Sequence, residues 1–216
     1  MARNKYPEVT VEKILEVSQR LFLTKGYDNT TIQDIVEELG GLTRGAIYHH
    51  FKSKEEIMDA LTRKMFFEKN PFEQVKKQTD LNGLQKMKLA IALNQSDKDA
   101  IVLSLQAIPI LKNPRILAGM IESNRQQLSP CWLELLMEGI ADGSIHTEYA
   151  KELSELIPLF DLWLTPSVYP ATAEELHHKF LFIKELLNKM GLPLFDEELL
   201  KKIAKTIAAM GDIQST

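Results

Sequence analysis

Two short amphipathic segments near the N-terminus are separated only by Gly40-Gly41-Leu42, and this spacing constrains the fold more than any other sequence feature. The first segment, residues 30–39, has apolar residues at helical spacing and begins with Thr-Thr-Ile-Gln, which has the spacing of a capping box. Glycine adopts positive φ without a Cβ penalty. A connection as short as this one can therefore turn the chain sharply. The pattern therefore predicts a helix-turn-helix.

The second segment, residues 43–51, is predicted to be a helix about 14 Å long at 1.5 Å per residue. Its buried side would carry Ala46, Ile47 and Phe51. The outer side would carry Thr43, Arg44, Gly45, Tyr48 and His49. A short helix with a donor-rich polar face suits the major groove of DNA, which is about 12 Å wide. The first helix of such a motif crosses the phosphate backbone.

The remainder of the chain also has helical periodicity, which predicts an all-α protein with a three-helix head and a helical body. We expect the head to span residues 1–53 and the body residues 54–216. A helix capped by Thr10 precedes the motif, and another starts at Ser53. Further helices are expected at about 82–94, 98–111, 114–141, 147–165, 172–190 and 196–210. Pro130 and Pro158 fall inside these segments, where kinks or breaks are expected.

Charge and cysteine content exclude some classes of protein. The net charge of −4 is uneven, because residues 1–54 hold eight Lys/Arg against seven Asp/Glu, and a locally basic head can still bind DNA. The single cysteine, Cys131, rules out an intramolecular disulfide framework. The N-terminus has no apolar signal region, so a cytoplasmic protein is predicted.

The motif resembles the tetracycline-repressor (TetR) family over about residues 8–57. The resemblance rests on Thr-Thr-Ile-Gln-Asp-Ile at 30–35 and on Leu-Thr-Arg-Gly-Ala-Ile-Tyr-His-His-Phe-Lys-Ser-Lys-Glu-Glu at 42–56. Gly41 departs from the alanine that the family usually has there. The resemblance implies a dimeric, ligand-responsive transcriptional regulator that binds double-stranded operator DNA.

The resemblance also implies roles for individual residues. Thr31 and Tyr48 would contact phosphates, and Thr43, Arg44, Gly45 and His49 would face bases or adjacent phosphates. Lys54 and the amides that open the following helix would hold another phosphate, because helix N-termini favour anions. Arg44 is the strongest candidate for reading guanine, since its fork can meet O6 and N7 together. The alternative interpretation of Tyr48 is that its side chain packs beneath its own helix instead of contacting a phosphate.

The body offers a candidate effector site around the segment 100–111, which is apolar almost all round and is therefore expected to be central. A mainly apolar cavity with a few polar anchors is the usual small-molecule site. The candidate lining residues are Phe66, Met87, Leu103, Gln106, Met120, Asn124, Trp132 and Phe160. The alternative is that these side chains simply fill the core.

The helices at about 147–165 and 172–190 are expected to form the interface of a homodimer, as the family's corresponding helices do. The predicted function is a repressor that a small, mainly apolar ligand releases from a palindromic operator. The alternative is a helical ligand-binding protein or enzyme in which the N-terminal motif is only structural. No catalytic motif occurs in the sequence. We therefore expect no enzymatic activity, no cofactor and no metal; adjacent histidines such as His49 and His50 point about 100° apart on a helix and could hardly share one ion.

Overall fold

The structure is a computed structural model that describes residues 7–68, 70–96, 111, 114–165 and 168–196. These residues divide into two compact units, one ending before residue 70 and the other beginning at Asn70. The regular structure in both units is helical, which confirms the all-α prediction. Within the part of the chain that is described, no helix is long and apolar enough to cross a membrane.

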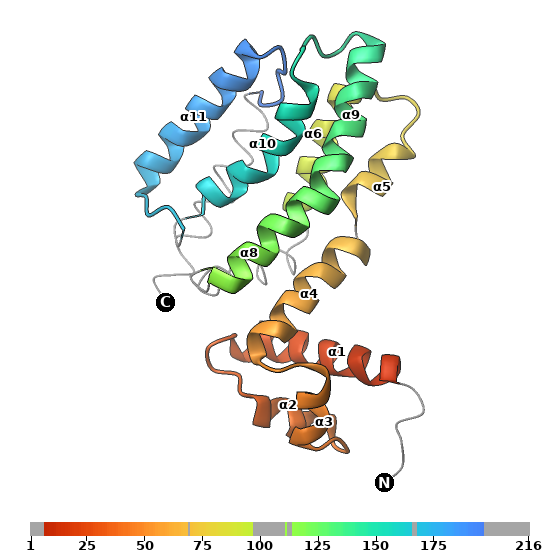
Figure 1. The fold of residues 1–216 in the computed structure, drawn as a ribbon, viewed down its shortest axis with the longest axis vertical. Coiled ribbons are helices and arrows are strands. Elements are labelled where there is room, and N and C mark those ends of the chain that lie inside the picture. The colour runs from red at the N-terminus through yellow and green to blue at the C-terminus, as the bar shows by residue number, and fades with distance from the viewer. Residues whose placement is uncertain (1–6, 69, 97–110, 112–113, 166–167, 197–216) are drawn as a thin grey trace. The chain divides into compact units, whose positions relative to one another are not determined.

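The first unit contains α1 (Pro7–Lys25), α2 (Ile32–Leu39), α3 (Arg44–His50) and α4 (Lys54–Glu68) (Figure 1). α1 packs against both α2 and α4. It begins four residues earlier than predicted, with proline in its first turn, so Thr10 lies inside the helix rather than capping it. α1 ends at Gly26, whose φ of 86° is the left-handed conformation expected there. The core of this unit includes the fully buried Ile14, Phe22, Ile35, Ile47, Ile57 and Leu61.

The second unit contains α5 (Pro71–Lys76), α6 (Gly83–Ser96), α8 (Pro114–Ser123), η2 (Asn124–Leu128), α9 (Ser129–Asp142), α10 (Ala150–Trp163) and α11 (Ala173–Lys189). α9 lies at its centre, between α6 and α10 (Figure 1). α5 was not expected from the sequence. Its cap is clear in retrospect, because the Asn70 side chain accepts a hydrogen bond from Phe72 N at 2.9 Å and proline occupies the first turn.

Two glycines let α6 and α9 cross at very short range. A Cβ on Gly83 would overlap the backbone N of Gly139, and a Cβ on Gly139 would overlap the Ile145 side chain. The Asp142 carboxylate accepts a hydrogen bond from Gly83 N at 2.6 Å, which satisfies an amide at the start of α6. Lys86, which is buried, forms an ion pair with Glu138 one turn further along. Close backbone contact and polar ties therefore fix this pair of helices.

The two prolines inside predicted helices have different consequences. Pro130 has no N–H for the α-helical ladder, and just before it the chain adopts the π-helical turn η2, in which Ser129 N donates to Asn124 O. At Pro158 no break occurs, and α10 continues from Ala150 to Trp163. The buried Asn124 side chain donates to Pro158 O at 3.4 Å, so both irregular positions meet in the core. The segments predicted as helices at 98–110 and from 197 onward lie outside the described residues.

Candidate nucleic-acid interface

The turn between α2 and α3 is built from local hydrogen bonds at both of its ends. α2 ends at Gly40, which has φ 59° and ψ 20°, a left-handed conformation that suits glycine. α3 begins after Thr43, whose hydroxyl accepts a hydrogen bond from Ala46 N at 3.2 Å. This N-cap sets the direction of α3.

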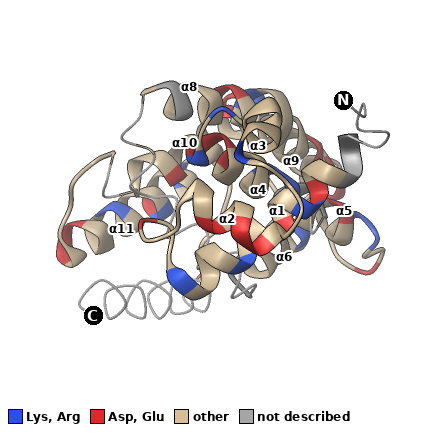
Figure 2. Cartoon of the chain, turned by 90° about the horizontal axis from the view of Figure 1, so that it is seen from below, with Lys and Arg blue, Asp and Glu red and all other residues tan. Residues whose placement is uncertain are grey.

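α3 presents one apolar and one polar side, as the sequence predicted. Ile47 is fully buried and Phe51, its C-cap residue, is 8% exposed. The opposite side of the helix is open to solvent at Arg44, Gly45, Tyr48 and His49. α3 contains no acidic residue, whereas the exposed surface of α2 includes Glu37 and Glu38 (Figure 2). The outward side of α3 is therefore the less acidic part of the motif.

Gly45 has no packing reason to be glycine. It lies in the first turn of α3 without a positive φ, and a Cβ there would meet only the Thr43 hydroxyl oxygen, at the ordinary contact distance of 3.8 Å. Glycine in a helix is less stable than alanine by roughly 0.5–1 kcal/mol. Packing within the protein therefore does not account for a glycine on this outward helical surface.

Arg44 and Tyr48 are neighbours one turn apart on α3. The Arg44 guanidinium donates to the Tyr48 hydroxyl at 3.4 Å and lies 5.6 Å from the centre of its ring. Tyr48 is 41% exposed, so it does not pack beneath the helix, which was the alternative from the sequence. Both side chains are presented together on the outward side.

Thr31 caps α2 through a complete capping box with Asp34. Its hydroxyl accepts from Asp34 N at 3.1 Å, and Asp34 Oδ2 accepts from Thr31 N at 2.7 Å. The ion pair with Lys25 at 2.8 Å, together with the Thr31 hydrogen bonds, lowers the pKa of Asp34 to about 2. Thr31 is exposed and accessible to DNA, but a carboxylate that stays ionised lies beside it.

Lys54 has a different environment from the one that a phosphate ligand needs. Its ammonium donates to Tyr27 O at 2.6 Å and to Thr30 O at 2.9 Å, and it lies 4.1 Å from the centre of the Tyr27 ring. The start of α4 is also occupied by its own groups, since Glu56 N donates to the Ser53 hydroxyl and the Glu56 carboxylate accepts from Lys52 N. In the chain without DNA these carbonyl groups occupy the Lys54 ammonium, and its role as a phosphate ligand stays a prediction. The exposed side chain of Lys52, which sequence reasoning passed over, lies two residues before it.

The predicted effector residues are only partly described. Met87, Asn124, Trp132 and Phe160 are buried in the second unit, and Met120 is half-buried. The Trp132 ring packs edge-on against Phe72 at 4.8 Å between centres, which is a core contact. Leu103 and Gln106, and the side chain of Phe66, lie outside the described residues.

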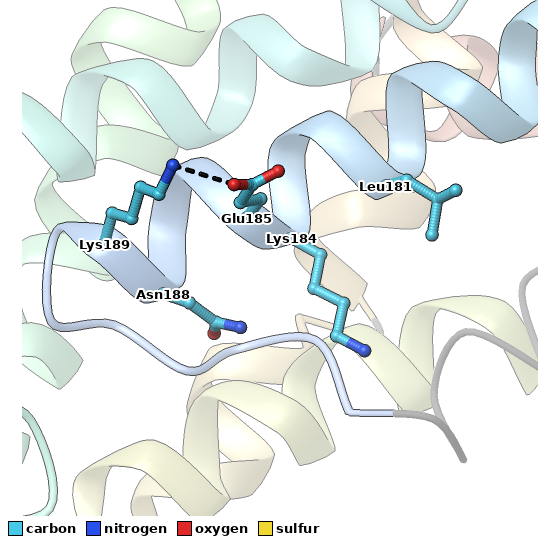
Figure 3. Close-up of a pocket in the computed structure, with 5 residues that line it drawn as sticks. All are labelled: Leu181, Lys184, Glu185, Asn188 and Lys189. Atoms are coloured by element: carbon cyan, nitrogen blue, oxygen red, sulfur yellow. Dashed lines mark ion pairs between the residues drawn. The ribbon is translucent and has the colours of Figure 1, made fainter.

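A groove among the described residues lies elsewhere, along α11. It is lined by Leu181, Lys184, Glu185, Asn188 and Lys189 (Figure 3). Glu185 and Lys189 form an ion pair of 2.7 Å across one helical turn. None of the predicted effector residues lines this groove, whose lining residues all come from α11.

Comparison with known proteins identifies the motif. Residues 14–61, which include all of α2 and α3, match the sequence profile of the bacterial regulatory proteins of the tetR family. Residues 14–61 therefore form a DNA-binding head of the TetR type. The repressor KstR2 of Mycolicibacterium smegmatis is 24% identical over 182 residues, which are 80% of this chain and 87% of that protein. KstR2 of Mycobacterium tuberculosis is 27% identical over 187 residues, 79% and 88% of the two chains.

The HTH-type transcriptional regulator TtgR of Pseudomonas putida is more similar, over a shorter stretch of this chain. It is 48% identical over 52 residues, which are 24% of either chain. The whole fold resembles a transcriptional regulator from Cytophaga hutchinsonii, with a TM-score of 0.60, 17% identity, and coverage of 95% of this chain and 96% of that one. The family-model match and the KstR2 relatives show a DNA-binding transcriptional regulator rather than an enzyme, and the enzyme alternative is not favoured.

Proposed function

We propose that this regulator is a homodimeric repressor that binds a palindromic operator and is released by a small, mainly apolar ligand. The observation that carries the proposal is the outward side of α3, where Arg44, Gly45 and Tyr48 are exposed to solvent and packing gives no reason for the glycine. In this proposal residues 1–53 bind DNA and residues 54–216 bind the effector and the second subunit, in the cytoplasm. The similarity to the KstR2 repressors supports repression.

We propose that Arg44, Gly45 and His49 approach base edges and that Thr31, Thr43 and Tyr48 contact phosphates. Thr43 suits this role, because a hydroxyl that accepts the N-cap hydrogen bond still has a proton to donate. Arg44 suits guanine, whose O6 and N7 accept both ends of a guanidinium. Lys54 is left out of the set because its ammonium already has protein partners.

Dimerisation would use the outer surfaces of α10 and α11. Leu159 on α10 and Leu181 and Phe182 on α11 are large apolar side chains that remain more than 40% exposed in the single chain. Phe182 also packs edge-on against Trp163, with 5.8 Å between ring centres, which holds it on the surface. By contrast, Ile183 and Leu187 are buried within the subunit, so they support the fold rather than the interface. A C2 dimer would place two α3 helices about 34–36 Å apart on one side of the duplex.

The ligand would be small and largely apolar, because the described part of the predicted site offers mainly Met87, Trp132 and Phe160, with Asn124 as a polar anchor. A ligand releases DNA only if it binds the DNA-incompetent arrangement more tightly than the other. α4 packs against α1 in the first unit and leads along the chain into the second, so it is the covalent route for such coupling.

The test combines operator selection with ligand titration. Duplexes selected from a random pool should be palindromic, and light scattering should give a dimer at micromolar concentration. Apolar compounds that raise the thermal midpoint should then weaken operator binding in fluorescence anisotropy. A monomer, or selected sequences without two-fold symmetry, would refute the dimeric part of the proposal. Stabilising compounds that leave operator affinity unchanged would refute release by the ligand.

A further inference from the structure

The ammonium of Lys54 is held in a closed set of contacts at the turn between α1 and α2. Tyr27 O and Thr30 O, at the two ends of that turn, accept hydrogen bonds of 2.6 and 2.9 Å from it. The Tyr27 ring faces it at 4.1 Å and is itself anchored by an edge-on contact with Phe22, with 5.1 Å between ring centres. An ammonium group has three N–H donors. Two carbonyls and one aromatic face therefore use its whole binding capacity.

The turn that Lys54 joins is already closed by its own hydrogen bonds. Thr30 N donates to Tyr27 O at 3.2 Å, and the Thr30 hydroxyl donates to Gly26 O at 2.7 Å. Thr30 is 1% exposed and directly precedes Thr31, the N-cap of α2. Lys54 is the first residue of α4. One side chain thus connects the start of α4 to the start of α2, 24 residues apart in sequence.

We propose that Lys54 is a positioning residue for operator binding: it fixes α2, and with it the turn and α3, relative to α4 without contacting DNA. The inference rests on the proposed DNA interface and goes beyond it. An ammonium has to be exposed to bind a phosphate, whereas that of Lys54 is half-buried among carbonyl groups. Withdrawal of the group from water lowers the pKa of Lys54 below the ordinary lysine value.

A reactivity measurement on the unmodified protein tests the contacts directly. Lysine acetylation followed by mass spectrometry, with and without a selected operator duplex, reports the accessibility of each ammonium. Lys54 should react slowly in the free protein and change little when DNA is added, whereas the exposed Lys52 should react readily in the free protein. A Lys54 that reacts readily in the free protein and becomes protected by DNA would overturn the proposal.

Substitution then separates positioning from phosphate contact. In Lys54→Met, operator affinity should fall at least about tenfold at a temperature where circular dichroism shows a folded protein. The slope of log K against log salt should not change, because no counterion is released by a lysine that does not touch DNA. A phosphate contact in each subunit would instead make the slope less steep by about 1.8 per dimer, at about 0.9 for each contact.

The matched control is Lys52→Met, which removes an exposed lysine from the same segment and should leave the thermal midpoint unchanged. A lower thermal midpoint in Lys54→Met with unchanged operator affinity would show a purely structural residue and refute positioning. If Lys54→Met does not fold, the acetylation result decides. Wild-type titration in the same experiment tests the proposed DNA binding itself, so its failure is distinguishable from failure of the Lys54 proposal.

Discussion

Replacing Gly45 with alanine should change stability and operator affinity in opposite directions. The new Cβ would lie 3.8 Å from the Thr43 hydroxyl oxygen, with no closer neighbour, so the fold accommodates it. Alanine in place of a helical glycine should then raise the free energy of unfolding by up to about 0.5–1 kcal/mol. If the α3 backbone approaches the base edges at this point, the same methyl group has to separate protein and DNA in each half-site. A loss of about 1.4 kcal/mol per half-site is tenfold, and about a hundredfold for a dimer.

The measurement is fluorescence anisotropy on a selected operator and on an unrelated duplex, together with denaturant unfolding of the free protein. Gly119→Ala is the matched control, because Gly119 lies in α8 with nothing within 4 Å of an added Cβ. It should raise stability in the same way and leave DNA affinity unchanged. Operator binding by Gly45→Ala that is as tight as that of the wild type would show that α3 does not approach DNA closely at this residue.

Five further substitutions test the interface, the dimer and the fold. Arg44→Ala should cost about 1–3 kcal/mol on the selected operator and relax preference at one base per half-site, whereas Tyr48→Phe should weaken all duplexes alike; anisotropy on matched and mismatched duplexes compares them. Phe182→Glu should give a folded monomer in light scattering, whereas Ile183→Glu, at a site that is 1% exposed, should unfold the chain; a dimer that survives Phe182→Glu would refute this interface. Gly83→Ala should destabilise the protein by about 3 kcal/mol in urea unfolding, because its Cβ would meet the α9 backbone, and an unchanged midpoint would contradict that packing.

The DNA-binding head could be predicted from sequence because its determinants are local. The left-handed Gly40 and the spacing of Ile47 each act within a few residues, so short patterns reveal them. The capping box is also local, but it joins Thr31 and Asp34, one residue later than the Thr30–Gln33 spacing predicted from the sequence. Lys54 could not be placed in this way, because its partners are backbone carbonyls 24 and 27 residues away and any residue type supplies a carbonyl. The close crossing at Gly83 is equally invisible, since its reason lies on α9.

Periodicity also could not separate the two apolar surfaces of α11. Leu176, Phe180, Ile183 and Leu187 have the spacing of an interface seam, yet Ile183 and Leu187 are buried in the subunit and Phe182 is exposed. A helix that packs on its own chain and also on a second copy has apolar residues on both sides. Sequence alone therefore predicted that this helix has a partner, but not which side chains face it.

The contact between Arg44 and Tyr48 sets the energetic cost of moving the Arg44 guanidinium from the Tyr48 ring to a base. In the free protein the guanidinium lies 5.6 Å from the Tyr48 ring centre, and an exposed interaction of this kind is worth about 0.5–1 kcal/mol. A bidentate contact with guanine discriminates by about 1–3 kcal/mol, so the guanidinium can leave the ring with a net gain. Until then the pair keeps both side chains on the outward side of α3, which reduces the conformational freedom that binding must remove. Arg44 should consequently contribute differently when Tyr48 is replaced by alanine, and a double-mutant cycle on the selected operator measures that coupling. Strict additivity would mean that the contact plays no part in recognition.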